Sequence, residues 1–205
     1  KSDFFNLGGQ KIYVSRTGYT NELGYELYCP SDINHKALWD HLMKCGAKYG
    51  MEFSSTRAMT MRRIEGGIRE NLVDMDTSVN PYDVGLGQFV NLDKENFIGK
   101  SSLINANKEN KLFGVICKKT VPEVHAKITK SGEEIGKITS GVFSPTLKCG
   151  IGFLRLNSPL KIIGEEVQMI MSDNSIENCE VVDLPFFDQE KKIARGLDTT
   201  IPDVS

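Results

Sequence analysis

Residues 11–28 read KIYVSRTGYTNELGYELY and predict two strands joined by a loop that contains glycine. Residues 11–15 alternate in the period of a strand, and extended character resumes after Gly24. The alternation places Glu26 and Tyr28 on the same face of the second strand. From periodicity alone, Glu26 is either an exposed strand residue or a buried acceptor for a planar pair of donors.

Two helices are predicted after this strand pair. Ser31 and Asp32 are good N-cap residues, and the amphipathic segment behind them closes at Gly50. A second helix is expected to start after Ser54-Ser55 and to end at Gly66-Gly67. Helices next to an antiparallel strand pair indicate the α+β class.

The second half of the chain has a different pattern of polar, apolar and turn residues. Residues 69–84 are polar and predict a long connection, whereas residues 85–92 are apolar and predict a strand. Beyond the polar residues 105–111, short strands separated by turn residues predict a small antiparallel barrel or sandwich. These strands are expected at residues 112–117, 125–129, 134–140, 151–156, 166–171 and 175–184.

The composition excludes several classes of protein. The 205 residues include 25 Lys and Arg against 27 Asp and Glu, and this near-balance argues against a nucleic-acid-binding tail or a polybasic membrane anchor. No run of about 18 uncharged apolar residues is present. The chain starts without Met, so we expect it to be a piece of something longer.

The cysteines and histidines do not form a recognisable metal site. The five cysteines are scattered without a C-x-x-C pair, and the three histidines are equally dispersed. We therefore expect no metal, and we expect reduced, mostly buried thiols in a cytoplasmic protein.

Four ordered blocks of this sequence resemble the folate-dependent aminomethyltransferase family, which is typified by the T-protein of the glycine cleavage system. Each block alone is weak, but four in order over residues 15–156 make chance similarity improbable. The blocks are Ser15 to Thr20 with Gly24-Tyr25-Glu26; Arg63 to Gly67 with Asp74-Met75-Asp76; Asn80 to Gly87 with Phe97 to Lys100; and Thr139 to Lys148.

The resemblance implies a fold and a ligand. Family members are longer, so the chain corresponds to their C-terminal part, within a channel-forming fold that holds tetrahydrofolate and ends in a β-barrel. The implied domains are the C-terminal part of the folate-binding domain at residues 1–108, the barrel at residues 109–187 and a polar tail at residues 188–205. Glu26 resembles the glutamate that receives the pterin ring, and Tyr19 matches an aromatic residue of the folate site.

The resemblance also implies the partners. They are tetrahydrofolate, a small one-carbon donor, the missing N-terminal segment and, where the donor is aminomethyl, a lipoyl carrier protein. The composition argues against nucleic acid and membrane as partners. The family's catalytic aspartate belongs to that N-terminal segment, so the catalytic residues of this chain are unknown. The loop of Asp74 and Asp76 either approaches the ligand or, as is commoner for loop acids, is solvated. Ser140, Ser144 and Lys148 are expected to form a shaped turn near the channel mouth.

Departures from the family pattern bear on the one-carbon donor. Met59 stands where T-proteins usually have an arginine, six positions before Glu65, and Gln88 and Asn71-Leu72 also differ from their pattern. These departures favour relatives that keep folate and use another donor, such as dimethylsulfoniopropionate demethylase or the folate domain of dimethylglycine- or sarcosine-oxidising enzymes. A non-catalytic folate-binding iron–sulfur assembly factor is a further alternative, but its characteristic motif is not found at residues 69–74.

Overall fold

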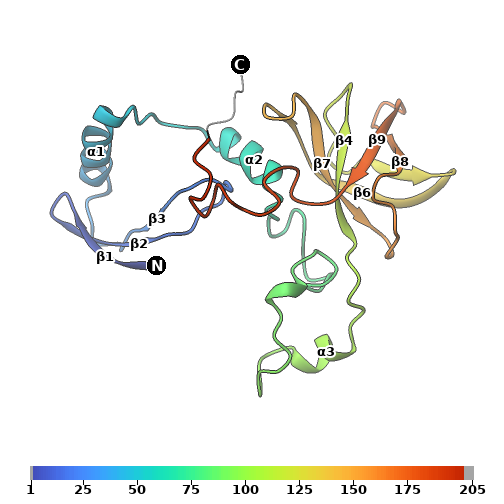
Figure 1. Ribbon diagram of the computed structural model, residues 1–205, viewed down its shortest axis with the longest axis horizontal. Coiled ribbons are helices and arrows are strands. Elements are labelled where there is room, and N and C mark those ends of the chain that lie inside the picture. Colours follow the sequence, from blue (N-terminus) through green and yellow to red (C-terminus); the bar gives the residue numbers. More distant parts are fainter. Residues whose placement is uncertain (1, 201–205) are drawn as a thin grey trace. The chain divides into compact units, whose positions relative to one another are not determined.

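The computed structural model describes residues 2–200, which form two compact units (Figure 1). The first unit contains residues 2–62 and 190–200, and the second contains residues 63–189. Mixed helix and sheet in these units confirms the α+β prediction. Within the described residues, no helix combines the length and apolar character needed to cross a membrane.

The first unit is built on a three-stranded antiparallel sheet with the order β1-β2-β3. The strand pair predicted around residues 11–28 is confirmed as β2 and β3, and β1 is an additional edge strand that the sequence pattern did not indicate. The elements are β1 (Ser2–Leu7), β2 (Gln10–Ser15), β3 (Glu26–Tyr28), α1 (His35–Gly46) and η1 (Ala47–Tyr49).

Helix α1 starts later than predicted. Asn34, rather than Ser31 or Asp32, is its N-cap, and the Asn34 side chain accepts a hydrogen bond from the backbone N–H of Ala37 at 2.9 Å. The helical segment closes at Gly50, as predicted, after the short 3-10 helix η1 that follows α1. Gly50 has a φ of 71°, a left-handed conformation that favours glycine.

Helix α2 (Thr56–Glu65) runs from the first unit into the second. Its predicted start is confirmed, because the Ser55 hydroxyl accepts a hydrogen bond from the Ala58 N–H at 3.3 Å. Gly67 follows its end with a φ of 68°, and a Cβ there would lie 3.0 Å from the Cα of Pro185. Glycine is therefore required for both conformation and space.

The strand predicted at residues 85–92 is wrong. This segment turns through a short 3-10 helix, η2 (Gly87–Phe89). Gly85 has a φ of 70°, and the N–H of Leu86 bonds back to the carbonyl of Pro81 at 2.8 Å. The chain therefore makes a turn here and does not extend. A short helix, α3 (Lys100–Asn105), follows before the first strand of the barrel.

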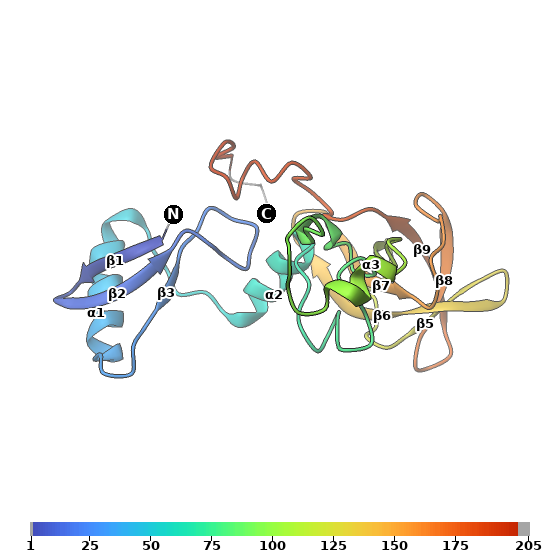
Figure 2. The same cartoon turned by 90° about the horizontal axis from the view of Figure 1, so that it is seen from below.

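The barrel prediction is confirmed (Figure 2). Six antiparallel strands close in the order β4-β7-β6-β5-β8-β9, and β9 pairs back to β4. Apolar side chains on alternate positions, such as Ile128, Ile138 and Leu154, are fully buried inside it. The strands are β4 (Leu112–Cys117), β5 (Lys127–Lys130), β6 (Glu133–Ser144), β7 (Cys149–Leu156), β8 (Glu166–Ile170) and β9 (Ile176–Val182).

The expectation of reduced, mostly buried cysteines is wrong in two respects. Cys117 at the end of β4 and Cys179 in β9 form a disulfide, with their Cα atoms 4.6 Å apart. Strand pairing at the barrel closure brings them together across 62 residues of sequence. Cys29 and Cys45 are exposed. The argument from reduced thiols to a cytoplasmic location therefore loses its premise.

Candidate functional site

Glu26 is the first residue of β3 and is half-buried. Its Oε2 accepts hydrogen bonds from the Thr17 hydroxyl and, at 3.2 Å, from the Tyr28 hydroxyl. The prediction that Glu26 and Tyr28 share a face is confirmed by this contact. Among the described residues, no side chain or backbone group donates to Oε1 of Glu26, so two hydroxyls orient the carboxylate through one oxygen.

An aromatic row lies on the same face of the sheet. Register places Phe4, Tyr13 and Tyr28 side by side, with ring centroids 5.1 Å apart for the first pair and 6.0 Å apart for the second. Ser15, the cross-strand partner of Glu26, adjoins this row. The face therefore combines an oriented carboxylate with aromatic surface, the two features that bind a flat heterocycle carrying hydrogen-bond donors.

Tyr19 lies half-buried in the loop between β2 and β3. Arg16 braces this loop, because its guanidinium donates to the Gly24 carbonyl at 3.0 Å and to the Ala194 carbonyl at 2.9 Å. The loop is therefore held at both ends. The part of Tyr19 in folate binding stays a prediction.

Met59 lies on α2 with 38% of its surface exposed. Arg57, the nearest arginine before it, is exposed, whereas Arg62 forms an ion pair with Glu22 within the first unit. The positive charge of Arg62 is therefore paired with the Glu22 carboxylate.

The expectation of a solvated Asp74 is wrong. The side chain is fully buried and pairs with Arg63 at 2.6 Å. It also accepts hydrogen bonds from the hydroxyls of Thr139 at 2.7 Å and Ser140 at 2.6 Å, and from the Glu70 N–H at 2.9 Å. These bonds compensate the desolvation of both charges and tie the end of α2 to the barrel strand β6.

Glu65 is a second buried carboxylate. It accepts hydrogen bonds from the Ser144 hydroxyl and from the Thr146 N–H, the latter at 3.2 Å. The predicted shaped turn is wrong for Ser140, which lies inside β6 and donates to Asp74. Ser144 ends β6 and accepts a hydrogen bond from the Leu147 N–H at 3.0 Å, and Lys148 lies in the turn that follows, with a φ of 54°.

Asp76, unlike Asp74, is partly exposed and carries a strongly shifted pKa. Hydrogen bonds from the Ser78 hydroxyl and N–H, followed by a bond from Arg155 at 3.1 Å, lower the pKa of Asp76 to about 2 from its ordinary 3.8. These bonds favour the charged form of the carboxyl group.

We expect the stabilisation from Asp76 to be present above pH 4 and to be lost as the pH falls from about 4 towards 2. The direction follows because the folded-state pKa lies below that of the unfolded chain. Carboxyl-carbon NMR should place the midpoint of Asp76 near 2 and show a rise in Ser78→Ala. A midpoint near 3.8 in the unmodified chain would contradict this prediction.

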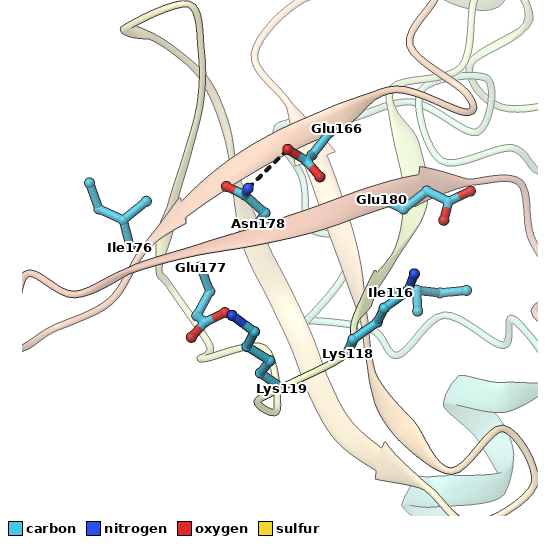
Figure 3. Close-up of a pocket in the computed structure, with 8 residues that line it drawn as sticks. All are labelled: Ile116, Lys118, Lys119, Glu166, Ile176, Glu177, Asn178 and Glu180. Carbon is cyan, nitrogen blue, oxygen red and sulfur yellow. Dashed lines mark hydrogen bonds between the residues drawn. The ribbon is translucent and has the colours of Figure 1, made fainter.

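A hollow of about 370 Å³ lies on the surface of the barrel (Figure 3). It contains none of the predicted ligand-binding residues, and its polar lining includes Asn178, which donates to Glu166 at 2.9 Å. Across residues 2–200, no three His, Cys, Asp or Glu side chains are grouped to hold a metal ion.

Two family models match most of the chain. The "GCVT N-terminal domain" matches residues 1–94, and the "Glycine cleavage T-protein C-terminal barrel domain" matches residues 110–188. The aminomethyltransferase of Caldanaerobacter subterraneus is 31% identical over 93% of this chain and 51% of its own length. That of Halothermothrix orenii is 37% identical over 88% of this chain and 51% of its own length.

A solved structure shares the fold. The crystal structure of the glycine cleavage system aminomethyltransferase T from Bartonella henselae matches with a TM-score of 0.76 at 24% identity, over 87% of this chain and 50% of that one. The chain thus spans about half the length of the relatives it matches. On the two domain matches and these relatives, the chain belongs to the glycine cleavage T-protein family, whose curated members are named aminomethyltransferases.

Proposed function

We propose that this chain is part of a tetrahydrofolate-dependent one-carbon transferase, and that Glu26 binds the pterin ring. The observation that carries the proposal is the Glu26 carboxylate, oriented by Thr17 and Tyr28 beside an aromatic row in a chain of this family. The group transferred to folate is an aminomethyl or methyl group.

The chemistry of the pterin supports this role for Glu26. The ring presents an N–H and an amino group side by side, and such a donor pair matches the two oxygens of a carboxylate. Oε1 receives no bond within the described residues, and Oε2 accepts from two hydroxyls. We assign Tyr19 to the same folate site as an aromatic contact.

The protein's contribution to the reaction is positioning. Holding the folate nitrogen close to a one-carbon donor, away from water, accelerates transfer without further reactive groups from this chain. We propose that the catalytic residue and the remaining channel wall come from the half of the family's fold that this chain lacks. A lipoyl carrier is the donor-bearing partner if the transferred group is aminomethyl.

The domain division follows the same reasoning. We propose a folate-binding part at residues 1–108, a barrel at residues 109–187 and a polar tail beyond residue 187. The ranges of the two family matches support this division.

Met59 favours a second candidate for the donor. An arginine at this position would carry a positive charge that attracts an anionic ligand, whereas methionine is apolar. This replacement supports a methyl donor such as dimethylsulfoniopropionate, or the products of dimethylglycine or sarcosine oxidation. A non-catalytic folate-binding assembly factor is the least supported alternative.

Glu26→Gln is expected to weaken tetrahydrofolate binding by about 10- to 100-fold, because one oxygen and the charge of the acceptor are lost. The measurement is a calorimetric titration of the chain completed by the half that its relatives carry. Glu166→Gln, an exposed carboxylate on the barrel, is the matched control and should leave the affinity unchanged.

Equal affinity in Glu26→Gln and the unmodified protein would remove the pterin assignment. Incubation of the completed protein with tetrahydrofolate and either dimethylsulfoniopropionate or an aminomethyl-lipoyl carrier then separates the donors by their products, methyl- or methylene-tetrahydrofolate. Folate binding without product from any donor would favour the assembly factor.

A further inference from the structure

A segment that follows the barrel in sequence returns to the first unit. Residues 190–200 group with residues 2–62 and lie beside the loop between β2 and β3 (Figure 1). They form turns, in which the N–H of Gly196 bonds to the Ile193 carbonyl at 2.9 Å. We call residues 190–200 the returning segment. Its backbone bonds give it a defined shape next to the loop that leads into Glu26.

Arg16 joins the returning segment to the loop of residues 16–25. Its guanidinium donates through Nη1 to the Gly24 carbonyl at 3.0 Å and through Nη2 to the Ala194 carbonyl at 2.9 Å. The same group lies over the Tyr25 ring, 5.4 Å from the ring centroid. A planar guanidinium holds two carbonyls at once, because its donors point in fixed directions. Arg16 therefore closes the base of the loop and bonds it to the returning segment.

Gly196 brings the returning segment against the loop at a second point. Its φ is 71°, a conformation that favours glycine, and a Cβ there would lie 3.2 Å from Cδ1 of Leu23. The backbone of the returning segment therefore approaches the Leu23 side chain closely. Arg16 and Leu23 stand near opposite ends of the loop, so the returning segment contacts the loop at both ends.

The loop determines the position of the Glu26 carboxylate. Thr17, which directly follows Arg16, donates its hydroxyl to Oε2 of Glu26. Gly24, which Arg16 holds through its carbonyl, precedes Glu26 by two residues. Ordering a loop costs conformational entropy, and contacts that order it before the ligand arrives reduce this cost at binding. The contacts of Arg16 therefore preorganise the carboxylate from both sides of the loop.

We propose that the returning segment is a structural part of the folate site. It holds the loop in the conformation in which Thr17 orients Glu26, and Arg16 is the positioning residue through which it acts. The inference rests on the proposed function and deepens it, because it makes the site depend on Ala194, which lies 178 residues after Arg16. Neither Arg16 nor the returning segment is assigned a contact with the ligand.

Calorimetric titration of the completed protein with tetrahydrofolate tests the inference. Arg16→Met keeps the apolar stem and removes every donor, so we expect the dissociation constant to rise about 10-fold. Arg16→Lys keeps the charge without the planar donor pair and should raise it less. Arg195→Met is the matched control, because it removes an exposed guanidinium from the returning segment itself. Its dissociation constant should change by less than about 3-fold.

A double-mutant cycle separates positioning from general damage to the fold. If Arg16 acts through the carboxylate, Arg16→Met should raise the dissociation constant by less than about 2-fold in the Glu26→Gln background. Independent damage would instead leave the effects of the two substitutions additive. Denaturant unfolding followed by circular dichroism checks that each variant is folded under the conditions of the titration.

Hydrogen exchange without folate gives a second measurement. Gly196→Ala is expected to speed the exchange of the amides of residues 17–25, because the new methyl group displaces the returning segment from Leu23. Gly132→Ala is the matched control. Gly132 also has a positive φ, 84°, but a Cβ there meets nothing within 4 Å, and it lies in the barrel, so exchange in the loop should not change.

The outcomes distinguish this inference from the proposed function. Unchanged affinity in Arg16→Met while Glu26→Gln weakens binding would overturn the inference and leave the proposed function standing. Additive effects in the cycle, or loop exchange that Gly196→Ala does not speed, would overturn it as well. Unchanged affinity in Glu26→Gln would remove the proposed function and, with it, the inference.

Discussion

Asp74→Ala is expected to lower the free energy of unfolding by about 3–5 kcal/mol. The substitution leaves the Arg63 guanidinium, only 4% exposed, without its closest counter-charge and removes the acceptor of the Thr139 and Ser140 hydroxyls. The exposed Glu70 carboxylate, 3.0 Å from Arg63, compensates little because water screens it. Denaturant titration of the whole chain, followed by circular dichroism, measures the loss.

Asp76→Ala is the matched control for this prediction. It removes a carboxylate from the same loop that also pairs with an arginine, Arg155, but the Asp76 side chain is 38% exposed, so we expect a clearly smaller loss than for Asp74→Ala. The double change Asp74→Leu with Arg63→Met should recover much of the stability, since it removes both buried charges. Equal losses in Asp74→Ala and Asp76→Ala would contradict the buried-pair account.

The barrel was predictable because its strands follow local rules. Alternating apolar residues and turn residues specify each strand, and residues 112–117 became β4 without a change of bounds. β1 was missed for a physical reason, because adjacent Phe4 and Phe5 point to opposite faces and do not alternate with polar residues. The segment at residues 85–92 was apolar enough for a strand, but glycine at 85 and 87 permitted the turn.

The site was predictable only where one strand determines the geometry. Alternation was sufficient to place Glu26 and Tyr28 on one face. The burial of Asp74 was missed because the loop composition favours solvent, and its hydroxyl partners Thr139 and Ser140 lie 65 and 66 residues away. Such contacts depend on how the loop meets the barrel, which local patterns do not encode.

Breaking the Cys117–Cys179 disulfide is expected to lower the free energy of unfolding by about 4 kcal/mol, in the chain-entropy account for a loop of 62 residues. The bond joins β4 and β9, the first and last strands of the barrel, so it restricts the unfolded chain across nearly the whole barrel sequence. The change is Cys117→Ala with Cys179→Ala, or reduction of the unmodified chain, and the measurement is denaturant unfolding followed by circular dichroism.

Two controls isolate the disulfide from the loss of a buried side chain. Cys149→Ala removes an unpaired, half-buried thiol from β7 of the same barrel, and we expect it to cost clearly less than the double change. A reducing agent should destabilise the unmodified chain and Cys149→Ala alike, and it should leave the Cys117→Ala, Cys179→Ala variant unaffected. Trp39 lies in the first unit, so its fluorescence should change little when only the barrel opens. If reduction leaves the unfolding midpoint of the unmodified chain unchanged, the closure of the barrel rests on strand pairing and core packing alone.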